Sequence, residues 1–356
     1  MLQDDPDRTI IRAPPARVQP LAPLPRARTA IALPAGHRLH EYRVDKVLGQ
    51  GGFGITYLAT DVHLHAPVAI KEYLPEDIAF RTAGKTVSPN ATRNRPRYES
   101  GLASFLAEAR TLASLRHPNI VRVARFFEAN HTAYMVLEYE RGSPLKQWWP
   151  AHEQLPEKDL LRLLQPLFDG VASMHASGIL HRDIKPDNIQ VRESDGSLVL
   201  LDFGSARAAS QGGAPGDVAV TPGYAPIEQY HDEAQGPWTD LYSLGATLYW
   251  MVSGKAPAGA DVRLASGEPL VSAQSLGAGR YSEPFLAAVD WALQLEPRDR
   301  PQHLDEWRAA LFAAHASSLG LQEALRASDA LAGAGAPGGG RSRRAVRRIA
   351  AIARAA

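Results

Sequence analysis

The sequence predicts an α+β fold with two lobes, a small lobe rich in antiparallel strands and a larger lobe rich in helices. From Tyr42 onward, short runs alternate apolar and polar residues between glycine turns, which is typical of antiparallel strands. Beyond Gly142, apolar residues recur every three or four positions, as they do in helices that bury one face. This change of period places the boundary between the lobes near residue 140.

Each lobe has its own predicted elements. In the small lobe, residues 102–115 have the apolar spacing of a helix, and the predicted strands are 42–48, 55–59, 68–71, 120–128 and 133–139. About thirty residues rich in Pro, Arg, Thr and Asn separate the third strand from that helix, which is long for a loop and indicates an insertion. In the large lobe, residues 197–201 form a predicted strand, and the predicted helices are 157–175, 239–253, 282–295 and 302–315.

Composition excludes several classes of protein. The chain of 356 residues contains no cysteine, so disulfides, cysteine-bound metals and thiol nucleophiles are excluded. It has no run of about 18 apolar residues that could span a bilayer and no signal-like N-terminus, so we expect a cytoplasmic protein without a transmembrane segment. The net charge of +1 arises because basic ends offset an acidic body, which disfavours nucleic acid as a partner.

The two ends differ in composition from the folded part. Residues 1–38 are rich in Pro and Arg and are predicted to be a disordered leader. Residues 316–340 are predicted to be a short helix and a Gly-rich linker, and residues 341–356 a basic tail with six arginines. The predicted folded domain is therefore 39–315, with its lobes at 39–140 and 141–315.

Five short motifs follow one another along the domain. They are Gly49-Gln-Gly-Gly-Phe-Gly54, Val68-Ala-Ile-Lys71, His181-Arg-Asp-Ile-Lys-Pro-Asp-Asn188, Asp202-Phe-Gly204 and Ala225-Pro-Ile-Glu228. In this order they resemble the protein kinase family, and Lys185 two residues after Asp183 resembles its serine/threonine branch. The Lys-Glu-Tyr-Leu-Pro sequence that opens the insertion is similar to that of some bacterial, Hanks-type kinases. The resemblance covers residues 40 to about 315 and implies a bilobal protein-kinase-like fold, with the small-lobe helix corresponding to αC.

The resemblance assigns the nucleotide to the small lobe and the hinge. Gly49, Gly51 and Gly54 would let backbone amides lie over the phosphates of ATP, although by itself this string is equally compatible with a hairpin turn. Lys71 would hold phosphate oxygens and would itself be held by Glu108, with Glu99 as the rival carboxylate. The residues expected around the adenine are Thr56, Ala69, Leu137, Glu138, Tyr139, Glu140 and Gln190, of which Gln190 replaces a usually apolar residue and has the option of a hydrogen bond.

The resemblance assigns the chemistry to the large lobe. Asp183 would orient the attacking hydroxyl or accept its proton, and Lys185 would neutralise charge on the transferred phosphoryl group. Asn188 and Asp202 would hold Mg²⁺ through oxygen atoms, while His181 is expected to be a packing residue. Asp240 would brace the loop at Asp183, and Glu228 would pair with Arg300 unless the extra residue in Ala-Pro-Ile-Glu displaces it.

Three segments suggest regulation. Ser210 is the best candidate for a phosphate that pairs with Arg182, and Thr221 is expected to hydrogen-bond near Asp183. Thr9 is a possible autophosphorylation site for a phosphothreonine-binding domain, against the simpler interpretation of an inert leader. The tail 341–356 has a small apolar face that offers a weak possibility of membrane-surface contact, but a solvated tail is favoured.

The sequence thus predicts an ATP- and Mg²⁺-dependent serine/threonine protein kinase whose substrates are proteins, including itself. The alternative is a pseudokinase scaffold that binds nucleotide without turnover. Intact Lys71, Asp183, Asn188 and Asp202 argue against that alternative.

Overall fold

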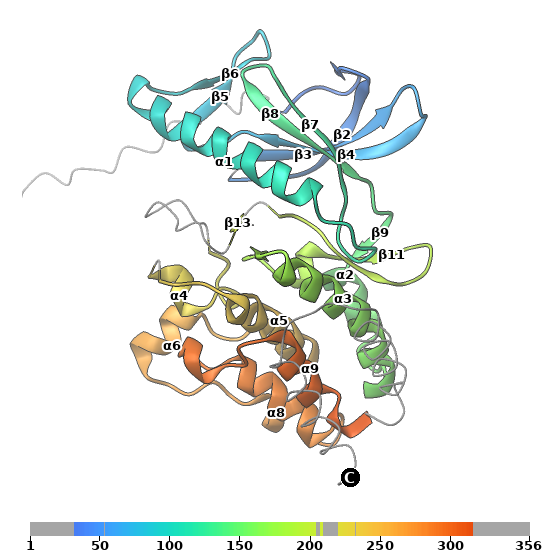
Figure 1. The fold of residues 1–356 in the computed structure, drawn as a ribbon, viewed down its shortest axis with the longest axis vertical. Coiled ribbons are helices and arrows are strands. Elements are labelled where there is room, and N and C mark those ends of the chain that lie inside the picture. Colours follow the sequence, from blue (N-terminus) through green and yellow to red (C-terminus); the bar gives the residue numbers. More distant parts are fainter. Residues whose placement is uncertain (1–31, 53, 204–206, 209–219, 232, 316–356) are drawn as a thin grey trace, which may run out of the picture.

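The computed structural model describes residues 32–52, 54–203, 207–208, 220–231 and 233–315. Both predicted lobes are present, with the strands and one long helix in the small lobe and most of the helices in the large lobe (Figure 1). The α+β class and the bilobal arrangement predicted from the sequence are therefore confirmed.

The small lobe is built on one antiparallel sheet with the strand order β1-β2-β3-β4-β8-β7. Its strands are β1 (Arg38–Leu39), β2 (Tyr42–Gly51), β3 (Gly54–Asp61), β4 (Ala66–Tyr73), β7 (Val123–Ala129) and β8 (Thr132–Glu138). Buried and less buried residues alternate along β3, as expected when one face of a sheet is packed against a core. Helix α1 (Arg95–Ala113) crosses in front of the sheet (Figure 1).

Helix α1 begins seven residues earlier than the predicted start at residue 102. Its first turn is polar, so it lacks the apolar period that marks the rest of the helix, but Pro96 sits at the start of the helix, where proline is favoured. The insertion therefore shrinks to residues 74–94, and it is partly ordered as a hairpin of β5 (Ala79–Arg81) and β6 (Val87–Pro89) followed by the 3-10 helix η1 (Thr92–Asn94).

The described part of the predicted leader is packed against the small lobe. Leu33 is buried, the backbone N–H of Gly36 donates to the carbonyl of Val44 at 2.7 Å, and the N–H of Val44 donates to the carbonyl of His37 at 2.9 Å. Packed structure therefore begins before residue 39. Residues 1–31 and 316–356, which contain Thr9, the linker and the basic tail, lie outside the described residues.

The large lobe is centred on α5 (Pro237–Ser253), most of whose residues are buried. The four predicted helices are confirmed as α3 (Glu157–Ala176), α5 (Pro237–Ser253), α8 (Glu283–Ala292) and α9 (Leu304–Leu311). Shorter helices are α2 (Leu145–Trp148), α4 (Ile227–Tyr230), α6 (Ala260–Ser266) and α7 (Ala273–Gly277). Short strands lie between the lobes: β9 (Gly142–Pro144), β10 (Ile179–Leu180), β11 (Ile189–Arg192), β12 (Leu198–Leu200) and β13 (Arg207–Ala208).

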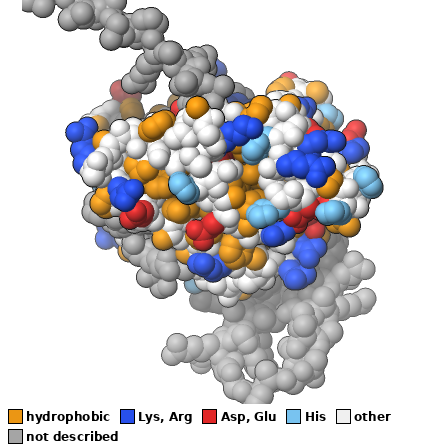
Figure 2. Space-filling model, turned by 90° about the horizontal axis from the view of Figure 1, so that it is seen from above, with side chains coloured by type: hydrophobic (Ala, Val, Ile, Leu, Met, Phe, Trp, Pro, Cys, Tyr) orange, Lys and Arg blue, Asp and Glu red, His pale blue; other side chains and the backbone are white. Residues whose placement is uncertain are grey.

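The surface of the small lobe that faces away from the large lobe is mixed in character. Figure 2 shows acidic, basic, histidine and apolar side chains interspersed over this face. Among the described residues, no helix has both the length and the apolar character needed to cross a membrane.

A buried ion pair joins two distant segments of the large lobe. Arg300 donates to both carboxylate oxygens of Glu228, at 2.8 and 3.0 Å, and both side chains are fully buried. The hydroxyl of Thr239 donates to the same carboxylate at 2.9 Å, and Arg300 also donates to the carbonyls of Gln294 and Leu295. The extra residue Ile227 therefore does not displace the predicted contact.

Because the pair is fully buried, removing one charge leaves the other uncompensated. We expect Glu228→Gln to lower the free energy of unfolding by about 3–5 kcal/mol, measured by urea denaturation. Glu233→Gln is the matched control, since Glu233 is exposed and lies in the same segment, and its effect should stay below about 0.5 kcal/mol. Equal stability of the two variants would contradict this account of the pair.

Candidate active site

The loop that carries Asp183 is held in place by one buried carboxylate from helix α5. Asp240 accepts the backbone N–H of His181 at 2.9 Å and that of Arg182 at 2.8 Å, and its Oδ2 lies 2.8 Å from Nε2 of His175. Arg182 has a φ of 70°, in the left-handed region that non-glycine residues seldom adopt. Asp240 therefore braces the loop, as predicted, in a conformation that needs outside support.

The pKa of Asp240 shows how this carboxylate is stabilised. Burial favours the neutral acid, but the hydrogen bond and charge of His175 and the hydrogen bond from the N–H of Arg182 hold the pKa below its ordinary value. Asp240 is therefore ionised near neutral pH and can accept hydrogen bonds at both oxygens.

Three other residues predicted for the site lie within hydrogen-bonding distance of Asp183. Nζ of Lys185 lies 2.9 and 2.8 Å from the two carboxylate oxygens of Asp183, and the hydroxyl of Thr221 donates to Oδ1 at 2.8 Å. The side-chain amide of Asn188 donates to the carbonyl of Asp183 at 2.8 Å and to its Oδ2 at 2.9 Å. Lys185 also donates to Thr221 at 2.9 Å, so in this network Asp183, Lys185 and Thr221 are all joined to one another, and Asn188 is joined to them through Asp183.

His181 lies behind this network and is fully buried. Its Nε2 is 2.9 Å from the carbonyl of Leu201, and its ring lies 4.6 Å, centroid to centroid, from that of Phe203. Burial lowers the pKa of His181, although the charge of Asp240 opposes the shift. The ring is therefore neutral at pH 7 and packs between the loop and the segment that leads to Asp202, as predicted.

Lys71 reaches from β4 toward the large lobe and forms an ion pair with Asp202. Burial alone would lower the pKa of Lys71, but the carboxylate of Asp202, and after it that of Glu108, raise the pKa above its ordinary value. Glu108 on α1 thus lies close enough to Lys71 for its charge to raise the pKa of the lysine. Glu99 is largely exposed and lies 4.0 Å from Arg95, so it does not fill the role of the rival carboxylate.

The residues predicted for the adenine site share one face of the sheet. Thr56 lies opposite Lys71 in the β3–β4 register, and Ala69 lies opposite Leu137 in the β4–β8 register, so all four point toward the same side. Glu138 ends β8, and Tyr139 and Glu140 follow it into the large lobe. Below them, the amide of Gln190 donates to the carbonyl of Glu140 at 3.2 Å, which is the hydrogen-bonding option predicted for this residue.

The glycine loop joins β2 to β3, and its glycines serve different purposes. A Cβ on Gly49 or Gly51 would meet no atom within 4 Å, so the backbone there has open space beside it. A Cβ on Gly54 would lie 1.9 Å from the carbonyl oxygen of Glu72. Gly54 is therefore required by the packing of β3 on β4, and the phosphate role of the three glycines stays a prediction.

The donor set of Asn188 and Asp202 fits a magnesium ion bound together with phosphates. Both offer hard oxygen atoms, and the backbone N–H of Leu201, next to Asp202, donates to the carbonyl of Asn188 at 2.8 Å. Asp202 has a φ of 54°, and its side chain is 52% exposed, so its carboxylate is accessible. Among the described residues no group of three His, Asp or Glu side chains could hold a metal ion.

Several contacts of the site were not predicted from the sequence. The amide of Gln229 donates to the carbonyl of Arg182 at 2.8 Å, and His175 supports Asp240 from helix α3. Burial, and then the charge of Asp187, raise the pKa of Tyr224 to about 12. Gln229 and His175 lie outside the five motifs, and their partners are far away in the sequence.

The buried neutral His181 predicts a pH dependence of stability. The unfolded chain takes up a proton near the ordinary pKa of 6.5, whereas the folded chain does so only at lower pH, so stability present above pH 6.5 is lost as the pH falls. We expect His181→Phe to reduce the slope of the unfolding free energy below pH 6.5 by up to about 1.4 kcal/mol per pH unit.

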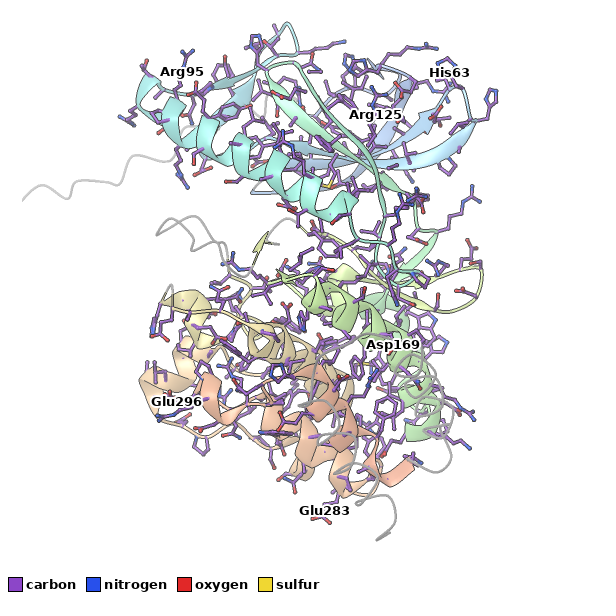
Figure 3. All side chains as sticks on the ribbon, in the orientation of Figure 1. His63, Arg95, Arg125, Asp169, Glu283 and Glu296 are labelled. Atoms are coloured by element: carbon purple, nitrogen blue, oxygen red, sulfur yellow. The ribbon has the colours of Figure 1, made fainter. Side chains whose placement is uncertain are left out.

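The measurement is urea denaturation at a series of pH values. His63→Gln is the control, because it removes an imidazole from an exposed position at the edge of the small lobe (Figure 3). A slope that is the same in wild type and His181→Phe would show that His181 does not titrate as proposed.

Comparison with known proteins agrees with this geometry. The family model described as "Protein kinase domain" matches residues 42–306. Serine/threonine-protein kinase PknA of Nostoc sp. is 34% identical over 271 residues, or 73% of this chain and 45% of the relative. Serine/threonine-protein kinase pkn2 of Myxococcus xanthus is 33% identical over 290 residues, or 78% of this chain and 32% of the relative.

A solved structure of a protein described as "PpkA-294 apo form" is 40% identical, with a TM-score of 0.69, and the match covers 79% of this chain and all of that one. The chain spans less than half the length of the two curated relatives. The family match, the bilobal fold and the network around Asp183 lead to one conclusion. The chain belongs to the protein kinase family and carries a bacterial serine/threonine kinase domain of the Hanks type.

Proposed function

We propose that this chain transfers the γ-phosphoryl group of ATP to serine or threonine hydroxyls of proteins, including its own. The observation that carries the proposal is the network in which Asp183, Lys185, Asn188 and Thr221 converge within hydrogen-bonding distance. A carboxylate that can accept a proton thus lies beside a lysine that can neutralise phosphate charge, which is the combination phosphoryl transfer needs.

In the proposed reaction, the hydroxyl oxygen of the substrate forms a bond to the γ-phosphorus, and the bond between that phosphorus and the β–γ bridging oxygen breaks. ADP leaves, and the hydroxyl proton passes to Asp183. Lys185, 2.8 Å from Asp183, stabilises the charge on the transferred group. Thr221 holds Asp183 from the side of the segment 221–228, which is the segment proposed to receive the protein substrate.

The small lobe is proposed to bind and orient the nucleotide. Lys71 supplies a positive charge for phosphate oxygens, and its side chain is only 14% exposed, so the charge acts in a region of low solvent screening. Burial lowers the pKa of Lys71, but the charges of Asp202 and then Glu108 raise it above its ordinary value, so Lys71 stays protonated. Thr56, Ala69 and Gln190 are proposed to contact the base, with the backbone of Glu138 and Tyr139 beside it.

Mg²⁺ is proposed as the second cofactor, with Asn188 and Asp202 as its protein ligands. When bound, it would neutralise the charge of the β- and γ-phosphates. Asp202 is the ion-pair partner of Lys71, so the residue that holds phosphate and a residue that holds metal are adjacent in the fold.

The remaining predictions concern residues outside the described ranges. Phosphorylation of Ser210 or Thr9, docking of a phosphothreonine-binding domain and membrane contact of the tail 341–356 stay predictions, as does the cytoplasmic location. The prediction that Ser210 is phosphorylated rests on Arg182, the proposed partner of the phosphate, whose cationic side chain is buried in the loop before Asp183.

The test is transfer of labelled γ-phosphate to a basic protein substrate and to the chain itself in the presence of Mg²⁺. We expect Asp183→Asn to reduce kcat by about 10²–10⁴-fold, because the amide cannot accept the proton, with a smaller effect on the KM for ATP. Lys71→Met should abolish transfer as well, and acid hydrolysis of the product should yield phosphoserine or phosphothreonine. Nucleotide binding without any transfer by the wild type would favour the pseudokinase alternative.

A further inference from the structure

Three consecutive residues of β4 face three different parts of the small lobe. Lys71 points toward the site between the lobes, Glu72 points to the opposite face of the sheet, and Tyr73 meets helix α1. The residues after Tyr73 form the insertion 74–94. This arrangement places the phosphate-binding lysine next to the point where the insertion leaves the sheet.

Glu72 is a fully buried carboxylate that the proposed reaction does not use. The hydroxyls of Tyr57 on β3 and Tyr134 on β8 each donate to it at 2.7 Å, and Arg81 on β5 forms an ion pair with it. Burial, and then the charge of Glu72, raise the pKa of both tyrosines, so they remain donors. The guanidinium of Arg81 supplies the positive charge in this pocket, and it comes from the insertion.

The charge on Glu72 therefore requires the insertion to be docked. A buried carboxylate that loses its cation is strongly disfavoured, so the strand carrying Arg81 cannot leave the sheet while Glu72 stays buried. Arg81 also donates to the carbonyl of Lys85 at 2.9 Å, which closes the β5–β6 hairpin, and the N–H of Val87 donates to the carbonyl of Asn130 at 2.8 Å. The hairpin is thus fixed to the sheet at both of its strands.

The docked insertion in turn holds the first turns of α1. Asp77 forms an ion pair with Arg97 at 2.9 Å, and Asn90 accepts a hydrogen bond from Asn94 at 2.6 Å while it donates to the carbonyl of Asp77 at 2.8 Å. The hairpin lies beside the beginning of α1 in Figure 1, and Figure 3 labels Arg95 at that end of the helix.

Tyr73 makes a direct contact between β4 and α1. Its ring centroid lies 5.3 Å from that of Tyr98 and 5.8 Å from that of Phe105. A Cβ on Gly101 would lie 2.1 Å from the hydroxyl of Tyr73, so the glycine in the middle of the helix is what allows this close approach. Helix α1 is therefore fitted to β4 directly and through the insertion.

We propose that Glu72 and Arg81 are positioning residues that act through the insertion to fix α1, and with it Glu108, relative to Lys71. The proposal rests on the proposed function of Lys71 and Glu108. The insertion would thus hold in position the helix that supports the phosphate-binding lysine.

The informative variant is the double substitution Glu72→Gln/Arg81→Met. Arg81→Met alone leaves a buried, uncompensated carboxylate and risks unfolding the lobe, whereas the double variant removes both charges and keeps the side-chain volumes similar. Arg43→Met is the matched control, because Arg43 is an exposed arginine of the same lobe whose ion pair is with Asp45 on β2.

The first measurement is amide hydrogen exchange of the full chain, which does not depend on activity. We expect exchange in α1 residues 95–113 to become at least about tenfold faster in the double variant, with α5 in the large lobe unchanged. Arg43→Met should exchange as the wild type does. A double variant that keeps α5 protected and shows wild-type protection of α1 would overturn the proposal, whatever the outcome of the kinase assay.

The second measurement is a kinetic cycle with Glu108→Gln. If Arg81 acts through α1, the double variant should lower kcat roughly 10- to 100-fold. Adding Glu108→Gln to the double variant should then lower kcat by a much smaller factor than Glu108→Gln does in the wild type. Fully additive losses would show that the insertion does not act through Glu108 and would contradict the proposal. A wild type without transfer activity would refute the proposed function alone, because the hydrogen-exchange experiment still tests whether the insertion holds α1.

Discussion

The carboxylate of Asp240 is the interaction on which the proposed chemistry depends. It is buried in helix α5, and its bonds to the backbone of His181 and Arg182 fix the two residues that precede Asp183. With Arg182 held at positive φ, the chain turns so that Asp183, Lys185 and Asn188 face one another. A loop that supplies three functional side chains within a short stretch of sequence is thus supported from the rigid centre of the large lobe.

The small lobe follows the same physical rule in a different place. Glu72 and Asp240 are both buried carboxylates that accept hydrogen bonds from several elements, and each fixes a segment next to a functional residue. Asp240 is satisfied largely by backbone N–H groups and by histidine, whereas Glu72 has a guanidinium as partner. The first arrangement anchors a loop within the lobe, and the second makes an inserted hairpin part of the lobe.

Local sequence signals predict much of this molecule. The strands, the main helices and the residues around Asp183 lie in short segments whose pattern or motif is visible without any distant partner. The apolar pattern places the start of α1 seven residues too late, because the first turn is polar and is held by Asp77 and Asn90 in the insertion. The predicted third strand ends at Lys71, so Glu72 falls in the segment that was predicted to be an insertion, although β4 continues to Tyr73. The burial of Glu72 depends on Arg81, Tyr57 and Tyr134, which no local pattern brings together.

The measurement that tests the central claim most directly is single-turnover phosphoryl transfer, with enzyme in excess over labelled ATP, in wild type and Asp240→Asn. An amide at this position can accept with only one of its two polar atoms, so the loop loses part of its support, while the nucleotide site on the small lobe is untouched. We expect the rate of the chemical step to fall at least about tenfold with an unchanged Kd for ATP. An unchanged chemical step, or a loss confined to ATP binding, would contradict the claim that Asp240 sets the geometry of Asp183.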